Sequence, residues 1–384
     1  MDSPFLYNKY VTGQRFIGRK EDCTILGNLL NQGENVVLWE PVGTGKKSLV
    51  QQTMLGMRMR GVQFSTGEMT ALDVRSDELF LKRLGNTVIR TAASTPDEYE
   101  QVVRQYLPQT HFVFDRKAFS ETDDILSTNW DLDGQDVLAV LRLPYLLSAE
   151  RDGRMFLVIE EFQNLDLTGD GGKLFKAMEA VMDEMAERGV RTCSWIFSGS
   201  RVNAMESIFR ERHFFYRRVE HVRLSTVEEK EIVEHIIKGF LSSGKVIDRD
   251  LIAGACRLFK CNLSYINHFT SICDSLSKGY IMEPVLLEAL DMMIAIHRGR
   301  FVATMNDLTT FQVGMLKAIL DGCTKFSTAE VIRKYSLNSS ANVRRLKDAL
   351  MKKEIIAFDG EEEKPRILDP LFEYWLRNNY FKNR

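Results

Sequence analysis

The sequence is poor in the residues that build disulfide-bonded or metal-stabilised scaffolds. It has six cysteines and six histidines among 384 residues, and no two cysteines form a C-x-x-C pair. Scattered cysteines are typical of reduced thiols rather than of a disulfide or zinc framework. No apolar run approaches the ~20 residues of a membrane helix, and the first residues lack the charged-then-apolar pattern of a signal peptide. We therefore expect a cytoplasmic protein without membrane contact.

The chain also lacks an excess of charge of either sign. Lysine and arginine number 51 and aspartate and glutamate 53, which gives a net charge of −2. This balance does not favour nucleic acid as a general partner. A chain of 384 residues is long enough for two or three domains, each with its own core.

A phosphate-binding loop is the clearest motif. An apolar stretch, 36–39, leads into a glycine-bearing turn and then into a helix that we expect to open at Lys46. Backbone N–H groups of such a turn and the positive end of the following helix hold phosphate, and a lysine reaches the outer phosphates. The residues expected to hold ATP are Pro41, Val42, Gly43, Thr44, Gly45, Lys46, Lys47 and Ser48.

Two positions depart from the usual pattern G-x-x-x-x-G-K-[ST]. Glu40 replaces the first glycine, and Lys47 replaces the serine or threonine whose hydroxyl holds Mg²⁺. The lysine removes a metal ligand and adds a cation, so we expect weakened Mg²⁺ binding and partial compensation of phosphate charge. A shifted register with Ser48 on the metal would place Lys46 where glycine is needed, so Ser48 is only a reserve contact. A strand–turn–helix connection that binds nothing is the alternative.

The order of the other elements predicts an α/β fold. Strands expected at 69–74, 154–159 and 192–198 alternate with helices, which indicates a parallel sheet covered on both faces. From Thr226 onward the pattern is helical up to a short joint at 300–307. Three further helices and two short strands then predict a winged helix-turn-helix domain. We expect a P-loop core at 1–225, a helical lid at 226–303 and the winged helix at 304–384.

An acidic pair follows the apolar strand 156–159. Phosphoryl chemistry needs a carboxylate on the metal and a group that orients the attacking water, commonly at the end of a strand beside the phosphate loop. Glu160 is the candidate for Mg²⁺, although it is one methylene longer than the usual aspartate, and Glu161 is the candidate for activating water.

Together these motifs resemble those of the archaeal-type P-loop ATPases of the AAA+/STAND group, relatives of the origin-recognition ATPases. The resemblance covers nearly the whole chain. Phe16-Ile-Gly-Arg19 is similar to the family's N-terminal box, in which Phe16, Ile17, Gly18 and Arg19 would lie along the nucleotide base. Asp369-Pro-Leu-Phe-Glu-Tyr-Trp-Leu is similar to the closing helix, and Cys261-Asn-Leu stands where the family tends to have Gly-Asn-Pro.

The resemblance implies an ATP-dependent switch. Nucleotide would bind between core and lid and set the positions of lid and winged helix, with Ser198 sensing the γ-phosphate and Arg218 completing the site of a neighbouring subunit. Glu161, Ser198 and Arg218 are thus the implied catalytic residues. The departures at the nucleotide site predict slow hydrolysis at most, and a basic cluster on a solvated face is the alternative for Arg218.

Two alternatives to an ATP switch remain from the sequence. The altered loop could belong to a non-catalytic nucleotide-binding or structural module. The winged helix could instead bind DNA through Arg344, Arg345 and Lys347 on its candidate reading helix, although the wing-tip residues 361–363 are all glutamate and would repel phosphate. A protein partner is expected in either case, but the sequence does not identify it.

Overall fold

The computed structural model describes residues 3–151, 153–168, 171–358 and 364–382. The chain divides into two compact units. The helical unit contains Met1–Arg19, Pro41–Ser48 and Ser225–Arg384, and the α/β unit contains Lys20–Glu40 and Leu49–Leu224. The phosphate loop therefore makes its tertiary contacts within the helical unit, although its neighbours in sequence belong to the α/β unit.

The α/β unit is built on a five-stranded sheet in the order β2-β5-β6-β1-β7, with every neighbouring pair parallel. All residues of β1 and β6, two of the three inner strands, are buried, as expected of a parallel sheet covered on both faces. The α/β class predicted from the sequence is confirmed. The strands are β1 (Val36–Trp39), β2 (Ser65–Thr70), β5 (Met155–Glu160), β6 (Cys193–Gly199) and β7 (Glu220–His221).

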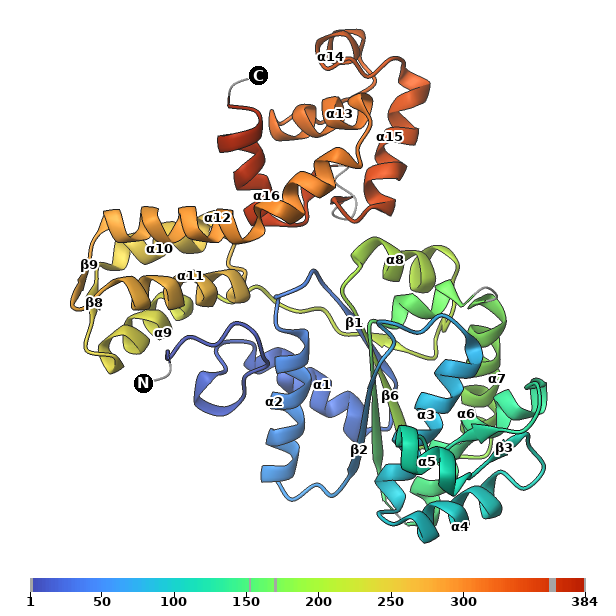
Figure 1. The fold of residues 1–384 in the computed structure, drawn as a ribbon. Coiled ribbons are helices and arrows are strands. Elements are labelled where there is room, and N and C mark those ends of the chain that lie inside the picture. Colours follow the sequence, from blue (N-terminus) through green and yellow to red (C-terminus); the bar gives the residue numbers. More distant parts are fainter. Residues whose placement is uncertain (1–2, 152, 169–170, 359–363, 383–384) are drawn as a thin grey trace. The chain divides into compact units, whose positions relative to one another are not determined.

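Helices cover the sheet on both sides (Figure 1). Helices α3 (Asp77–Ala92), α6 (Gly134–Glu150) and α7 (Gly171–Glu187) lie side by side on one face. On the other face lie α1 (Lys20–Asn31) and the part of α2 (Lys46–Met59) that belongs to this unit. Short helical segments follow β5 and β6: η2 (Phe162–Leu167), α8 (Val202–Glu206) and the π-turn η3 (Ser207–Glu211).

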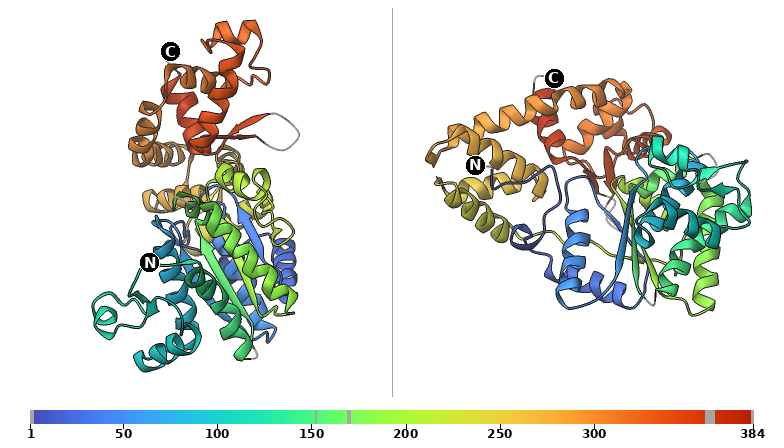
Figure 2. Two further views of the ribbon diagram at one scale, coloured as in Figure 1. Left: turned by 90° about the vertical axis from the view of Figure 1, so that its right-hand side faces the viewer. Right: turned by 60° about the horizontal axis from the view of Figure 1, so that its bottom comes forward.

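A small lobe is inserted between α3 and α6 (Figure 2). Its elements are α4 (Pro96–Tyr106), β3 (Phe112–Val113), α5 (Arg116–Thr122) and β4 (Ser127–Thr128). Thr95 and Glu98 form a capping box at the start of α4, with proline at the first helical position. The lobe therefore starts at a strong helix-initiation signal.

The helical unit joins a four-helix lid to a winged helix. The lid has α9 (Glu229–Ser242), α10 (Arg249–Leu258), α11 (Leu263–Leu276) and α12 (Glu283–Asn306), with a two-strand contact between β8 (Val246–Ile247) and β9 (Tyr280–Ile281). The winged helix has α13 (Thr310–Leu320), α14 (Ala329–Lys334), α15 (Ser340–Lys352), an antiparallel hairpin of β10 (Ile356–Phe358) and β11 (Pro365–Ile367), then α16 (Pro370–Trp375) and η4 (Leu376–Tyr380).

The N-terminal residues belong to the core of the helical unit. They include one short helical turn, η1 (Gly13–Arg15). Phe5 is buried, its ring centroid lies 4.6 Å from that of Phe240, and a Cβ at Gly239 would meet its ring at 2.5 Å. This close approach fixes the start of the chain on α9.

Two local predictions were wrong. The strand expected at 69–74 lies at Ser65–Thr70, because its partner β5 begins at Met155, which pairs with Ser65, and ends at Glu160. The joint expected at 300–307 is helical as far as Asn306, because no proline interrupts it and Phe301 continues the buried face. Within the described part of the chain, no helix is both long and apolar enough to cross a membrane.

Candidate functional site

The phosphate loop has the backbone that its glycines predict. Gly43 and Gly45 have φ angles of +82° and +94°, a region that favours glycine. A Cβ on Gly43 would lie 2.7 Å from the Cβ of Ser264, and one on Gly45 would lie 2.9 Å from Nη1 of Arg19. Conformation favours glycine at both positions, and at Gly43 the closeness of Ser264 also leaves no room for a side chain.

The side chains of the loop fold across its backbone. The hydroxyl of Thr44 donates to the Pro41 carbonyl at 2.9 Å, and Nζ of Lys46 donates to the same carbonyl at 3.0 Å. Helix α2 begins at Lys46, so its positive end opens directly behind the loop. The ammonium group and the helix terminus are the two features that a phosphate-binding loop supplies.

The N-terminal box braces this loop. Arg19 donates through Nη1 to the Thr44 carbonyl at 2.6 Å and through Nε to the Ser225 carbonyl at 2.8 Å. Gly18 has a φ of +63°, and a Cβ there would meet the carboxylate of Glu231 at 2.9 Å. Phe16 is half-buried and Ile17 packs against the lid core. The sequence predicted these four residues as part of the site, and the structure places Arg19 against the loop backbone.

Helix α11 contacts the loop from the lid. The backbone N–H of Ser264 donates to the Gly43 carbonyl at 3.2 Å, and the amide of Asn262 donates to the Val42 carbonyl at 3.4 Å. Asn262 also caps α11 by accepting from the N–H of Tyr265. Cys261, just before the cap, has a φ of +57°, a backbone conformation that favours glycine. The sequence did not predict these loop contacts.

Residues of the α/β unit gather at one edge of the sheet. Glu160 pairs in register with Ser198, and Trp39 with Gly199, so the ends of β1, β5 and β6 meet there. Glu161 has a φ of +55°, and its carboxylate accepts hydrogen bonds from Ser200 at 2.6 Å and from Gln163 at 2.7 Å. The two serines differ, because Ser198 is buried within the strand whereas Ser200 reaches Glu161 directly.

An aromatic stack closes the end of β1. The ring of His221 lies parallel to that of Trp39, with centroids 3.7 Å apart, and the guanidinium of Arg210 lies 5.3 Å from the Trp39 ring. Burial, with Arg210 and Arg223 nearby, lowers the pKa of His221 to about 4. The imidazole is therefore neutral at physiological pH and serves as a flat packing surface.

Arg218 is engaged within its own chain. Its guanidinium donates twice to Asp183, each time at 2.7 Å, and lies 3.4 Å from the carboxylate of Glu179. This bidentate hydrogen bond raises the pKa of Arg218. A role in the site of a neighbouring subunit would require these ion pairs to break.

The winged helix presents two arginines on α15. Arg344 and Arg345 are exposed, whereas Lys347 is half-buried with its ammonium 5.2 Å from the ring of Phe326 and 4.8 Å from that of Phe358. Lys347 therefore packs on its own domain as well as carrying charge. The acidic wing tip, 361–363, lies outside the described residues.

A polar joint connects the lid to the winged helix. The hydroxyl of Tyr265 on α11 donates to the carboxylate of Asp369 at 3.0 Å, and Arg300 on α12 donates to the same carboxylate at 2.7 Å. Asp369 also caps α16 by accepting from two backbone N–H groups. Burial raises the pKa of Tyr265, and the neighbouring Asp369 carboxylate adds to the shift. One carboxylate thus ties three helices together.

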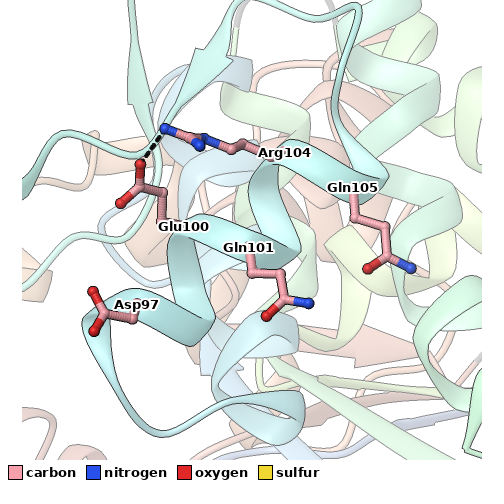
Figure 3. A pocket seen from close by; sticks show the side chains of 5 residues that line it. All are labelled: Asp97, Glu100, Gln101, Arg104 and Gln105. Atoms are coloured by element: carbon pink, nitrogen blue, oxygen red, sulfur yellow. Dashed lines mark hydrogen bonds and ion pairs between the residues drawn. The ribbon is translucent and has the colours of Figure 1, made fainter.

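Helix capping and ion pairing explain two other clusters of polar residues. His111, Asp133 and Asp136 lie close enough to hold an ion, but Asp133 and Asp136 form the capping box of α6 and His111 bonds to Asp136 at 2.8 Å. A second cluster lines a hollow of about 450 Å³ on α4 (Figure 3). Its charged side chains pair with one another or with Arg116 of α5; the lining residues are Asp97, Glu100, Gln101, Arg104 and Gln105.

Comparisons with known proteins agree with this architecture. Residues 299–378 match the family described as "probable winged helix domain". A search of curated protein sequences gave no match. The Walker-type ATPase of Pyrococcus abyssi is similar over 97% of this chain and 99% of its own, with a TM-score of 0.68 and 16% identity.

Two further archaeal proteins are similar at lower scores. The ORC2 protein of Aeropyrum pernix, solved as ADPNP–ADP complexes, has a TM-score of 0.58 and 11% identity over 95% of this chain and 93% of its own. Cdc6p of Pyrobaculum aerophilum has a TM-score of 0.50 and 11% identity over 95% and 94% of the two chains. The resemblance expected from the motifs is confirmed: the chain has the fold of the archaeal Walker-type and origin-recognition P-loop ATPases, with a C-terminal winged helix domain.

Proposed function

We propose that the chain binds ATP and ADP through the loop 41–48 and acts as a slow nucleotide-dependent switch. The observation that carries the proposal is the backbone of the loop. Gly43 and Gly45 both have positive φ, and α2 opens at Lys46 behind them. This arrangement presents backbone N–H groups, a helix terminus and an ammonium group to one anion.

A route for the switch runs from the loop to the winged helix inside the helical unit. The Gly43 carbonyl accepts from the N–H of Ser264, and the next residue, Tyr265, bonds to the cap of α16, Asp369. A phosphate that moves the backbone of Gly43 would strain or release the hydrogen bond to α11. Because Tyr265 is on the first turn of α11, that movement would reach the winged helix through one helix terminus.

Slow turnover is consistent with the acidic pair. Glu161 is the proposed base for water, but its carboxylate is already bonded to Ser200 and Gln163. These two hydrogen bonds hold the carboxylate in one orientation. We propose that Ser200 orients the Glu161 carboxylate, to which it donates a hydrogen bond, and that Ser198 senses the γ-phosphate.

We also propose domain limits of 1–225 for the P-loop core, 226–303 for the helical lid and 304–384 for the winged helix domain.

Calorimetry with ATP and ADP tests the proposal, alongside a phosphate-release assay on the same samples. Lys46→Ala should weaken ATP binding by about tenfold or more, because it removes a charge placed on the phosphates. Lys278→Ala is the matched control, since Lys278 is an exposed lysine of the same unit outside the loop. An absence of ATP binding at millimolar concentration, with a folded protein, would overturn the proposal.

DNA binding by the winged helix is a second candidate function. It is favoured by the exposed Arg344 and Arg345 on α15, the second helix of the helix-turn-helix. Retardation of duplex DNA at low salt, lost in Arg344→Ala/Arg345→Ala, would support it, and the binding should weaken steeply with salt. No retardation at low salt would exclude it for the duplexes tested.

Self-association is testable through Arg218. If Arg218 acts on a neighbouring subunit, phosphate release per molecule should rise with protein concentration and fall in Arg218→Ala. Arg217→Ala is the neighbouring control, because Arg217 lies over the ring of Tyr216, 5.2 Å from its centroid. An effect of Arg217→Ala alone would move the role to that arginine.

A further inference from the structure

The first turn of α2 does not fit Mg²⁺. In a phosphate-binding loop, the residue after the loop lysine supplies a hydroxyl to the metal; here that residue is Lys47, which has three N–H donors and no acceptor. The next residue, Ser48, lies about 100° further round the helix. Its hydroxyl already accepts a hydrogen bond from the backbone N–H of Val11 at 3.1 Å. Neither residue therefore supplies a hydroxyl at the usual metal-ligand position of this turn.

A segment near the N-terminus lies across this turn, and we call residues 7–11 the N-terminal strap. Val11 holds Ser48, as described, and the ring centroid of Tyr10 lies 5.6 Å from Nζ of Lys47. At its other end, the carbonyl of Tyr7 accepts from the hydroxyl of Ser264, and its ring stacks on His268 with centroids 4.1 Å apart. The strap therefore contacts Lys47 and Ser48 on the first turn of α2 and reaches α11 at its other end.

Positive charge is concentrated around the loop backbone. Lys46 bonds to the Pro41 carbonyl, Arg19 bonds to the Thr44 carbonyl, and Lys47 adds a third cation on the same turn of α2 as Lys46. An ammonium group carried at the metal-ligand position attracts phosphate oxygens and repels a divalent cation. The charge that Mg²⁺ would neutralise on a triphosphate is then partly neutralised by the chain itself.

We propose that Lys47 takes the place of Mg²⁺, so that this loop binds ATP without a divalent cation. The proposal rests on the nucleotide binding proposed above. Within it, the ammonium of Lys47 turns from Tyr10 toward the outer phosphates when nucleotide enters, and Lys46 keeps the usual lysine position. Because Lys47 is exposed and its side chain is flexible, this movement requires no rearrangement of the fold.

The test is calorimetric titration of the full chain with ATP, once in EDTA and once in excess Mg²⁺. For the unaltered protein, the dissociation constant should differ by less than about threefold between the two buffers, whereas metal-dependent loops lose far more when the metal is chelated. A loss of about tenfold or more in EDTA would overturn the proposal. No ATP binding in either buffer would overturn the proposed nucleotide function itself, so the two failures are distinguishable.

Two variants separate the charge of Lys47 from the missing hydroxyl. Lys47→Thr restores the usual ligand and removes the cation, so its ATP affinity should fall by about tenfold in EDTA and recover in Mg²⁺. Lys47→Met removes the cation without adding a ligand and should be weakened in both buffers. Circular dichroism and thermal melting check that both variants are folded, which the exposure of Lys47 favours. Unchanged affinity of Lys47→Met in EDTA would overturn the role assigned to the ammonium group.

Discussion

Replacement of Gly43 by alanine is the most direct test of how the phosphate loop is held. The φ of +82° at this position costs an alanine about 1–2 kcal/mol of backbone strain. The new methyl group would also lie 2.7 Å from the Cβ of Ser264, at the start of α11, so the helix or the loop must shift. We expect Gly43→Ala to lower the free energy of unfolding by about 2–5 kcal/mol, the sum of about 1–2 for strain and about 1–3 for overpacking.

Gly244→Ala is the matched control. Gly244 has a φ of +73° and lies in the same unit, but a Cβ there would meet nothing within 4 Å. Its substitution therefore carries the backbone strain alone. The difference between the two variants in urea or thermal unfolding isolates the contact between the loop and α11. Equal losses in the two variants would refute the packing of Gly43 against Ser264.

A double mutant tests the same contact from the other side. Ser264→Gly removes the Cβ that the new methyl group would meet, at the cost of a few tenths of a kcal/mol in helix propensity and of the hydrogen bond from the Ser264 hydroxyl to the Tyr7 carbonyl. In the Gly43→Ala background the same change should cost less than in the unaltered chain, or should stabilise, because it relieves the overlap. Strict additivity of the two substitutions would show that the two residues are not in contact.

Three further predictions concern sites outside the loop. Burial lowers the pKa of His221 to about 4, so between about pH 6.5 and 4 the unfolded chain binds a proton that the folded chain does not. As the pH is lowered through this range, the free energy of unfolding should drop by about 1–2 kcal/mol more than in His221→Phe, which keeps the ring stack on Trp39. Unfolding measured as a function of pH gives this difference. Asp369→Ala should lower the free energy of unfolding by about 2–3 kcal/mol. Asp369→Asn should lower it by only about 1 kcal/mol, because asparagine keeps the helix cap and one acceptor for Tyr265. Denaturant unfolding of the two variants measures the difference. Glu161→Gln should reduce phosphate release by about 100-fold or more while ATP affinity changes little, and an unchanged release rate would remove Glu161 from the chemistry.

The loop could be predicted from the sequence because its geometry is local. Gly43 and Gly45 need positive φ for reasons that lie within eight residues of chain, and α2 follows directly. The order of strands and helices could also be predicted, because the periodicity of hydrophobic residues within each element is a local property of the sequence. The winged helix followed from three short helices and a hairpin, and its family match confirms it.

The partners of the loop could not be predicted in the same way. Ser264 lies more than 200 residues from Gly43, and no periodicity in the sequence relates the two. The left-handed backbone at Cys261 is equally hidden, because the residue there is not glycine. The predicted boundaries of β2 were wrong for a related reason. Pairing with β5 decides where β2 starts and ends, and that register is a property of the sheet rather than of the local sequence.

The two departures in the loop differ in what they change. The backbone N–H of Glu40 lies 3.4 Å from the Gly199 carbonyl, so residue 40 extends the sheet edge before the loop begins. The phosphate-binding backbone starts later, between Gly43 and Lys46, and a side chain at position 40 leaves it intact. Lys47 stands inside the first turn of α2, where the metal ligand would be. The loss of the first glycine is therefore compatible with the proposed phosphate binding, whereas Lys47 is the departure to which we assign the neutralisation of phosphate charge.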